Sequence, residues 1–382
     1  MTYIDAAIEV LKLIHMNGYE AYFVGGFVRD YILDVESNDI DIATNALPEQ
    51  ISNIFKVVNS GIKYNCVTIK YEGYSFETTT YRLEEEYHDN RHPIYKVAST
   101  LSLDLKRRDF TVNAMAMDVD FQVIDLYNGL SDLKNGIIRT VNEPTKRFTE
   151  DALRMLRAAY FSAKLGFKIE TETLKAMRKC SYLIQNLSND RICWELEKII
   201  NSKHARMGID YLIETNIAPY LLYFKKGIYL ISEKDLHNLS WTEFLALSFY
   251  DSIVNLKDIH IKSEVLNNVT TAIQLAKGNL KNKYDSIYIF ENGLEICKLV
   301  NKINVVINNL KDNSEIIEEI YLDLPIKSMS DLAIKGQDIL DTIDLKEHKI
   351  IGRILVDIRN LVINKKLQNE KETILKYIRK HY

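Results

Sequence analysis

Two carboxylates separated by one residue, Asp39 and Asp41, are the residues of this chain best suited to metal chemistry. The alternation of polar and apolar residues in 39–42 predicts a half-buried strand, whose side chains at i and i+2 point to one face. Mg²⁺ prefers oxygen ligands and shares substrate phosphates, and a two-metal site uses such a carboxylate pair. An isolated Asp-X-Asp is nevertheless more typical of a solvated loop.

A glycine pair upstream reverses that judgement. Residues 20–24 predict a short buried strand, Gly25-Gly26 a tight turn, and 28–33 the first turns of a helix. Backbone N–H groups at a helix start favour anions such as a triphosphate. A phosphate cradle beside two carboxylates indicates a nucleotide site that binds Mg²⁺.

Glu77 is a further candidate, in a β-branched segment that predicts a strand. If that strand neighbours 39–42, Glu77 is a third carboxylate near the metals. It could equally be the cross-strand partner of Arg82 or Lys70, and both interpretations stay open.

Basic and acidic residues further along predict nucleotide contacts. The run Lys106-Arg107-Arg108 is expected to open a helix, where cations oppose the helix dipole unless an anion is bound. Asp151 and Arg154 are expected to share a helix face, as are Arg154 and Arg157. An ordinary surface ion pair is the simpler interpretation. Alternatively, a carboxylate accepts from the exocyclic amine of cytosine or adenine while a guanidinium donates to the ring nitrogen, which selects C and A.

The elements that must position these residues change character near residue 145. Strand-like and helical segments alternate before it, and helical periodicity dominates from Thr149 onward. The α/β part is expected to use strands at 20–24, 39–42, 66–71, 75–81, 123–126 and 137–141, with helices at 4–17, 48–55 and 111–115. The sequence predicts an α/β catalytic head followed by an all-helical remainder.

Composition limits the class of protein. The 382 residues suggest two to four domains, and the net charge of −4 leaves any RNA-binding face local. The N-terminal residues lack the pattern of a signal peptide, and no apolar run is long enough to span a membrane. Scattered cysteines at 66, 180, 193 and 297 indicate buried thiols in a reducing cytoplasm.

The motifs together resemble the bacterial class II CCA-adding tRNA nucleotidyltransferases, relatives of bacterial poly(A) polymerases in the polymerase-β-like superfamily. The match runs nearly end to end, and its tail resembles the compact Bacillus-type members. Single motifs are weak evidence, but their ordered set is specific. They lie at 25–30 with 39–41, 107–114, 125–129, 150–154, 188–191 with 195–196, 326–334 and 351–352.

The resemblance implies a multidomain fold, with an α/β polymerase-β-like nucleotidyltransferase head followed by an all-α neck, body and tail. The expected boundaries are 1–144 for the catalytic head, 145–205 for the base-recognising neck, 206–310 for the body and 311–382 for the tRNA-binding tail.

The resemblance also implies residue roles. Asp39 and Asp41 would bind catalytic metal, and the other assigned residues would bind nucleotide. Those are Gly25, Gly26 and Arg29 at the glycine turn, Arg108 for triphosphate or ribose, Asp151 and Arg154 for the base, and Arg157 for the triphosphate. Many members carry a further arginine where this chain has Tyr160, so that nucleotide contact is not carried over.

The implied function is template-independent addition of CCA to the 3′ end of tRNA from CTP and ATP in the cytoplasm, with release of pyrophosphate. A polar segment at 81–93, expected to be a flexible loop, has the spacing typical of full CCA-adding members at Glu84, Tyr87, Asp89, Arg91 and Pro93. The alternatives are a poly(A) polymerase, a partial CC- or A-adding enzyme, or a non-catalytic RNA-binding protein.

The partners would be tRNA, contacted at its 3′ end and acceptor stem or elbow, together with CTP and ATP, and no membrane. Residues 346–382 hold ten Lys or Arg against four acids, which predicts a phosphate-binding tail. A solvated helix face is the simpler interpretation of such a charge run.

Overall fold

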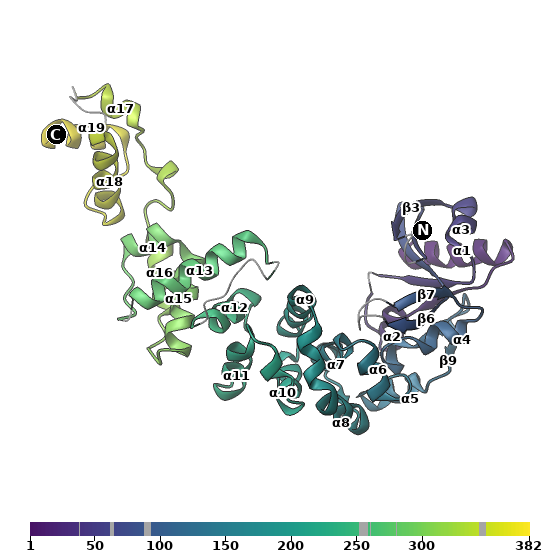
Figure 1. Ribbon diagram of the computed structural model, residues 1–382. Helices are drawn as coiled ribbons and strands as arrows, with labels where there is room; N and C mark the ends of the chain where they lie inside the picture. Colours follow the sequence, from purple (N-terminus) through teal and green to yellow (C-terminus); the bar gives the residue numbers. More distant parts are fainter. Residues whose placement is uncertain are drawn as a thin grey trace. The chain divides into compact units, whose positions relative to one another are not determined.

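The computed structural model describes residues 1–37, 39–61, 65–87, 93–251, 259, 261–279, 281–343 and 349–382, although the side chains of 59–61, 84–87, 93–96 and 349 fall outside the description. The chain divides into two compact units. The first contains Met1–Leu239, and the second begins at Ser240 and includes Ile261–Tyr382. Figure 1 draws the strands of the first unit in purple and blue and the helices that follow in teal.

A seven-stranded sheet of described residues forms the head, in the order β3-β4-β5-β2-β1-β8-β9. Central strand β1 pairs antiparallel with β2 and with β8, whereas β2 pairs in parallel with β5. The strands are β1 (Ala21–Val24), β2 (Asp41–Thr44), β3 (Lys56–Gly61), β4 (Cys66–Tyr71), β5 (Tyr74–Thr80), β8 (Met115–Met117) and β9 (Val123–Asp125). The α/β head expected from the sequence is therefore confirmed.

Helix α1 (Tyr3–Met16) packs against β1 and β5, and α2 (Gly26–Ile32) packs against β1 and β8. A capping box between Thr2 and Asp5 satisfies N–H groups at the start of α1. Its apolar stripe includes Val10 and Leu11, both fully buried. Helix α3 (Pro48–Ile54) packs on α1, with Ile51 buried.

The basic run does not open a helix, so that expectation was wrong. Helix α4 (Leu101–Lys106) ends immediately before Arg107 and Arg108, and a single 3₁₀ turn (Thr111–Asn113) leads into β8. The two arginines lie at a helix C-terminus, where the helix dipole favours cations. The helix expected over 111–115 is therefore absent: Thr111–Asn113 form a single 3₁₀ turn, and Met115 already belongs to β8.

Part of the segment 81–93, which was expected to be a flexible loop, lies in a two-stranded antiparallel sheet. Strands β6 (Arg82–Tyr87) and β7 (Pro93–Val97) pair antiparallel. Residues 88–92 lie outside the described part of the chain, as do the side chains at 84–87 and 93. The spacing motif of that segment therefore stays a prediction.

Helices complete the first unit. They are α5 (Gly129–Asn135), α6 (Pro144–Glu150), α7 (Leu153–Leu165), α8 (Thr171–Cys180), α9 (Asn189–Ile200), α10 (Ala205–Glu214) and α11 (Lys225–Glu233), with the short strands β10 (Ile137–Ile138) and β11 (Lys168–Ile169). Helix α7 contacts both α9 and α10. A Cβ at Gly208 of α10 would lie 2.8 Å from the Ala159 carbonyl oxygen and 2.9 Å from Ala163 Cβ. Glycine there allows α10 to pack closely on α7.

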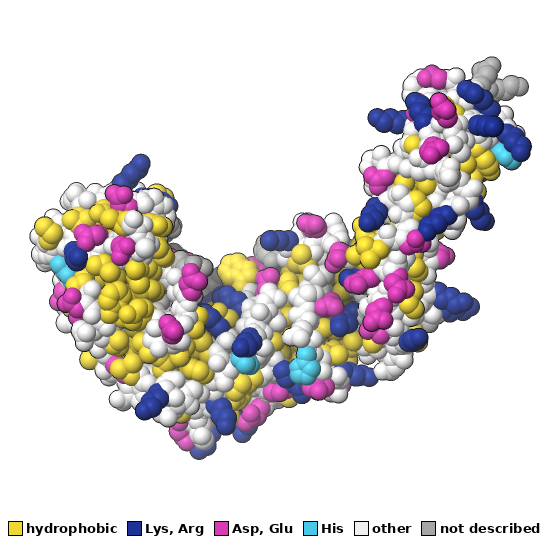
Figure 2. Space-filling view, turned by 180° about the vertical axis from the view of Figure 1, so that it is seen from behind, with side chains coloured by type: hydrophobic (Ala, Val, Ile, Leu, Met, Phe, Trp, Pro, Cys, Tyr) yellow, Lys and Arg dark blue, Asp and Glu magenta, His cyan; other side chains and the backbone are white. Residues whose placement is uncertain are grey.

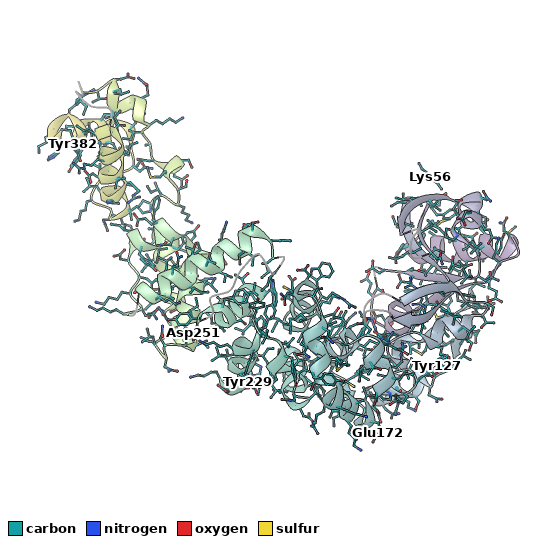
Figure 3. The ribbon with its side chains drawn as sticks, in the orientation of Figure 1. Lys56, Tyr127, Glu172, Tyr229, Asp251 and Tyr382 are labelled. Atoms are coloured by element: carbon teal, nitrogen blue, oxygen red, sulfur yellow. The ribbon has the colours of Figure 1, made fainter. Side chains whose placement is uncertain are left out.

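The second unit contains only helices among its described residues: α12 (Trp241–Phe249), α13 (Ser263–Gly278), α14 (Ser286–Asn292), α15 (Leu294–Val306), α16 (Ser314–Asp323), α17 (Gly336–Leu340), α18 (Lys349–Ile363) and α19 (Lys371–His381). Buried amides of Asn282, Asn301 and Asn304 join α15 to its neighbouring loops. At the chain end, Tyr382, labelled in Figure 3, donates its hydroxyl to Asp357 Oδ2 at 2.9 Å.

The all-helical remainder is thus confirmed, while the four-part division into head, neck, body and tail stays a prediction. No helix in the described ranges combines the length and apolar character needed to cross a membrane.

Candidate active site

A cleft of about 710 Å³ in the first unit collects side chains from α2, β2, the segment after α4, α7 and α9. Every predicted site residue except Glu77 lines it. The lining residues are Gly25, Gly26, Arg29, Asp39, Asp41, Arg107, Arg108, Asp109, Asn113, Asp151, Arg154, Arg157, Tyr160, Phe161 and Lys198. Residues separated by more than a hundred positions in the sequence therefore meet in one cavity.

The glycine turn allows a close approach of charged groups. Gly25 has φ of 69°, a conformation that side-chain-bearing residues rarely adopt. A Cβ at this position would lie 3.0 Å from Arg108 Nη1 and 3.7 Å from Asp41 Oδ2. Glycine is thus required both by the backbone and by the space that the Arg108 guanidinium occupies.

The two carboxylates lie at the start of β2. The sequence predicted a strand over 39–42, but β2 begins at Asp41, so Asp39 lies just before the strand. Burial raises the pKa of Asp41 to about 6, and the charges of Glu77 and Asp39 add to the effect while Arg108 opposes it. Tyr3 of α1 holds the residue between them, because its hydroxyl oxygen accepts from the Ile40 N–H at 3.2 Å.

Glu77 lies opposite Asp41 in the parallel pairing of β2 and β5. It is exposed, and its Oε1 accepts from the Cys66 thiol at 3.3 Å. Lys70, one of its predicted alternative partners, donates instead to the Ser75 hydroxyl. Glu77 therefore acts on Asp41 through its charge without lining the cleft.

Arg107 and Arg108 are fixed by one buried carboxylate. Arg107 Nη2 lies 2.8 Å from Asp104 Oδ1, and Arg108 Nη2 lies 3.2 Å from Asp104 Oδ2. Burial alone would raise the pKa of Asp104, but the two guanidinium groups bring that pKa below its usual value. Arg147 of α6 donates to the Arg108 carbonyl oxygen at 2.8 Å and so holds the backbone of this segment.

Arg29 and Arg157 approach the aromatic ring of Phe161. Their guanidinium carbons lie 5.4 and 5.2 Å from its centroid, within cation–π range. Arg29 donates to Asp30 at 2.7 Å and to Asn113 at 2.6 Å.

Arg157 Nε donates to Asp109 Oδ2 at 2.8 Å. Burial opposes ionisation of Asp109, yet the Arg157 charge and hydrogen bonds from Asn113 and Phe110 lower its pKa overall. The pair is consequently charged, and the Arg157 guanidinium is held at the wall of the cleft.

Asp151 and Arg154, the predicted base-selecting residues, are each held by another residue. Arg191 Nη2 donates to Asp151 at 3.0 and 3.2 Å, and the Leu153 N–H donates to Asp151 Oδ1 at 3.0 Å. Arg154 is only 6% exposed, and its Nη1 donates to Glu150 Oε2 at 2.9 Å. The Arg154 guanidinium is thus buried against Glu150 and is not part of an exposed surface.

Several of these residues were not assigned from the sequence. Asp109 and Asn113 stand inside the motif at 107–114, and Arg191 inside the motif at 188–191, so the motifs contained them without indicating what they touch. No motif or pattern in the sequence pointed to Lys198. Its Nζ lies 5.5 Å from the ring centroid of Tyr160, and it bonds Glu195 Oε1 at 2.8 Å.

Three known family descriptions match successive parts of the chain. "Poly A polymerase head domain" matches residues 21–139, which include β1, β2 and the glycine turn. "Probable RNA and SrmB- binding site of polymerase A" matches 166–225, and "tRNA nucleotidyltransferase domain 2 putative" matches 236–378.

Relatives match over almost the whole length. The CCA-adding enzyme of Ligilactobacillus salivarius is 36% identical, with 98% of this chain and 96% of the relative covered. That of Oceanobacillus iheyensis is also 36% identical, with 97% and 96% covered. The crystal structure of the Bacillus stearothermophilus CCA-adding enzyme in complex with CTP superposes with a TM-score of 0.83 at 28% identity, covering 100% of this chain and 98% of that one. The head and the helical remainder thus have their counterparts in these enzymes, and this chain belongs to the family of CCA-adding enzymes.

Proposed function

We propose that this protein adds the 3′-terminal CCA sequence to tRNA in the cytoplasm, using CTP and ATP without a nucleic-acid template. The observation that carries the proposal is the cleft itself, which joins Asp39 and Asp41 to the residue pair Asp151 and Arg154. It combines carboxylates for metal with a donor and an acceptor suited to C and A. The relatives that match over almost the whole chain are named CCA-adding enzymes.

Nucleotidyltransferases of this family use a divalent metal, and the residues here fit one. Asp39 and Asp41 are the carboxylates that would hold it, and the raised pKa of Asp41 reflects burial of its charge together with repulsion from Glu77 and Asp39, which a bound cation would offset. Oxygen ligands and a triphosphate substrate favour Mg²⁺. When bound, the metal lowers the pKa of the RNA 3′-hydroxyl and neutralises charge on the triphosphate.

The protein side chains position the substrates. Arg108 and Arg157 would contact the triphosphate, each already oriented by a buried carboxylate. Preorganised cations stabilise the developing charge without reorganisation during the reaction. The Gly25 turn allows the Arg108 guanidinium to lie near Asp41.

Base choice would depend on Asp151 and Arg154. Asp151 would accept from the exocyclic amine of cytosine or adenine, and Arg154 would donate to the neighbouring ring nitrogen. Uracil and guanine present the reverse order and would leave two acceptors facing each other. Arg191 and Glu150 keep the two side chains in place, so the selection would be built into the fold.

Nucleotide addition to a tRNA lacking its last three residues tests the proposal. We expect CTP alone to give a product two nucleotides longer, and CTP with ATP to give the complete CCA end. Extension by ATP alone, without prior C addition, would support a poly(A) polymerase. A product that stops after C-C, or an enzyme that adds only the final A, would identify a partial family member.

A further inference from the structure

Trp194 exposes a large aromatic surface on α9. Its relative exposure is 61%, whereas the other tryptophan of the chain, Trp241, is 9% exposed. The opposite side of α9 is buried through residues such as Leu196 and Ile199. The Trp194 indole is therefore not packed into the core as Leu196 and Ile199 are, and it is available to a ligand.

The exposed face of α9 is continuous with the cleft. Arg191 and Lys198 stand three residues before and four residues after Trp194, which places all three on one side of the helix. Arg191 bonds the cleft residue Asp151, and Lys198 itself lines the cleft. Trp194 is not among the lining residues, so its exposed indole extends the face of α9 beyond the part that Lys198 contributes to the cleft.

The chemistry of this face suits an unpaired nucleic-acid strand. Every nucleobase has a flat π face, and stacking on an exposed aromatic side chain is a sequence-tolerant way to hold single-stranded ends. Lys198 is 47% exposed at its side chain and keeps its ammonium group at this edge of the cleft, where a phosphate could approach. An incoming nucleoside triphosphate would occupy the cleft, whereas the strand that accepts it must enter from outside.

We propose that Trp194 is a stacking platform for the unpaired 3′-terminal bases of the RNA acceptor. The inference rests on the proposed function, since it names the residue that receives the end to be extended. Trp194 acts on the position of the acceptor strand, not on the choice of the incoming nucleotide.

Steady-state kinetics with full-length Trp194→Ala and Trp194→Phe proteins test this. We expect Trp194→Ala to raise KM for tRNA lacking its CCA end by about tenfold, the order of loss for one stacked base. KM for CTP should change little, and Trp194→Phe should retain most of the tRNA affinity because the ring is kept. Leu222→Ala is the matched control, since Leu222 is 78% exposed in the same unit and lies outside α9.

Intrinsic fluorescence supplies a second measurement. A short single-stranded RNA ending in C-C should quench the emission of the parent protein and leave that of Trp194→Phe nearly unchanged. Unaltered KM for tRNA in Trp194→Ala would overturn the platform while CCA addition by the parent stands. A rise in KM for CTP with constant KM for tRNA would also overturn it, because the indole would then contact the incoming nucleotide. A parent protein that adds no nucleotide would instead overturn the proposed function.

Discussion

Arg191 of α9 holds Asp151 at the start of α7, with Nη2 at 3.0 and 3.2 Å from its two carboxylate oxygens. The contact joins α9 to the residue between α6 and α7, close to Arg154 on α7. It fixes the direction in which Asp151 presents its oxygens to the cleft. The selectivity proposed for Asp151 therefore depends on a residue forty positions away in the sequence.

Replacing Arg191 with Ala is expected to weaken base selection without removing a substrate contact. The carboxylate of Asp151 would lose its charged partner, and discrimination of CTP against UTP should fall by about 1–3 kcal/mol, the range for one lost buried polar contact. Competition between CTP and UTP in single-nucleotide addition measures this. Arg178→Ala, at an exposed arginine of the same unit, is the control. Unchanged discrimination in Arg191→Ala would show that Asp151 keeps its orientation by other means.

Asp41→Asn is expected to stabilise the metal-free protein while abolishing nucleotide addition. The pKa of Asp41 is raised from 3.8 to about 6, so ionisation of this group costs free energy of folding above pH 6. In EDTA the variant should melt at a higher temperature than the parent at pH 8. That gain should shrink as pH falls through 6 and vanish below pH 3.8, where the carboxyl is protonated in both states.

Addition activity of Asp41→Asn should fall at least about 100-fold, as for loss of a metal ligand. The increase in melting temperature that divalent cations give the parent should disappear as well. A variant with a lower melting temperature than the parent in EDTA at pH 8 would contradict the cost that burial and neighbouring charges impose on the ionised Asp41.

Local features of the sequence predicted the parts of the site that are close in the chain. The Gly25 turn and the pair Asp39 and Asp41 could be identified because a turn and an alternating pattern extend over few residues. The same local logic failed for Arg107 and Arg108. Helix α4 ends just before them and β8 follows, so a run of three cations gave no indication of which end of a helix it occupies.

Contacts between distant segments could not be predicted at all. Asp109 with Arg157 and Asp151 with Arg191 pair side chains that the packing of α7 against its neighbours brings together. No periodicity records such pairs, and without knowledge of packing Asp151 and Arg154 looked like each other's partners. The structure adds Arg191 as a partner of Asp151 and Glu150 as a partner of Arg154.

Lys198→Ala is expected to raise KM for CTP and ATP several-fold. Lys198 lines the cleft, and its ammonium group lies over the ring of Tyr160. Removing the ammonium group should weaken anion binding, and Lys198→Arg should restore it. The double variant Lys198→Ala with Tyr160→Arg is a second test, since a guanidinium on α7 should recover part of the lost affinity. Equal KM values in Lys198→Ala and the parent would limit Lys198 to its bond with Glu195.

The C-terminal helices offer a separate test of tRNA binding. Figure 2 shows Lys and Arg side chains gathered over the C-terminal part of the chain. Arg359 does not belong to this exposed set, because its side chain is 11% exposed and its Nη2 lies 2.7 Å from Glu291 Oε1. Neutralising Arg359 would therefore test the packing of α18 on α14 and confuse stability with binding.

Lys376, Arg379 and Lys380 are exposed on α19 and, at spacings of three and four, share one face. Replacing all three with Gln should raise KM for tRNA and flatten its dependence on salt, since fewer counterions are released on binding. Turnover at saturating tRNA should stay near that of the parent, because the reacting atoms lie in the cleft of the other unit. KM for tRNA is measured at low and high salt. The control combines Lys281→Gln, Lys283→Gln and Lys311→Gln, which remove the same number of charges elsewhere. The comparison separates an effect of the α19 face from an effect of net charge. Identical salt dependence in the two triple variants would identify the α19 face as a solvated charge run.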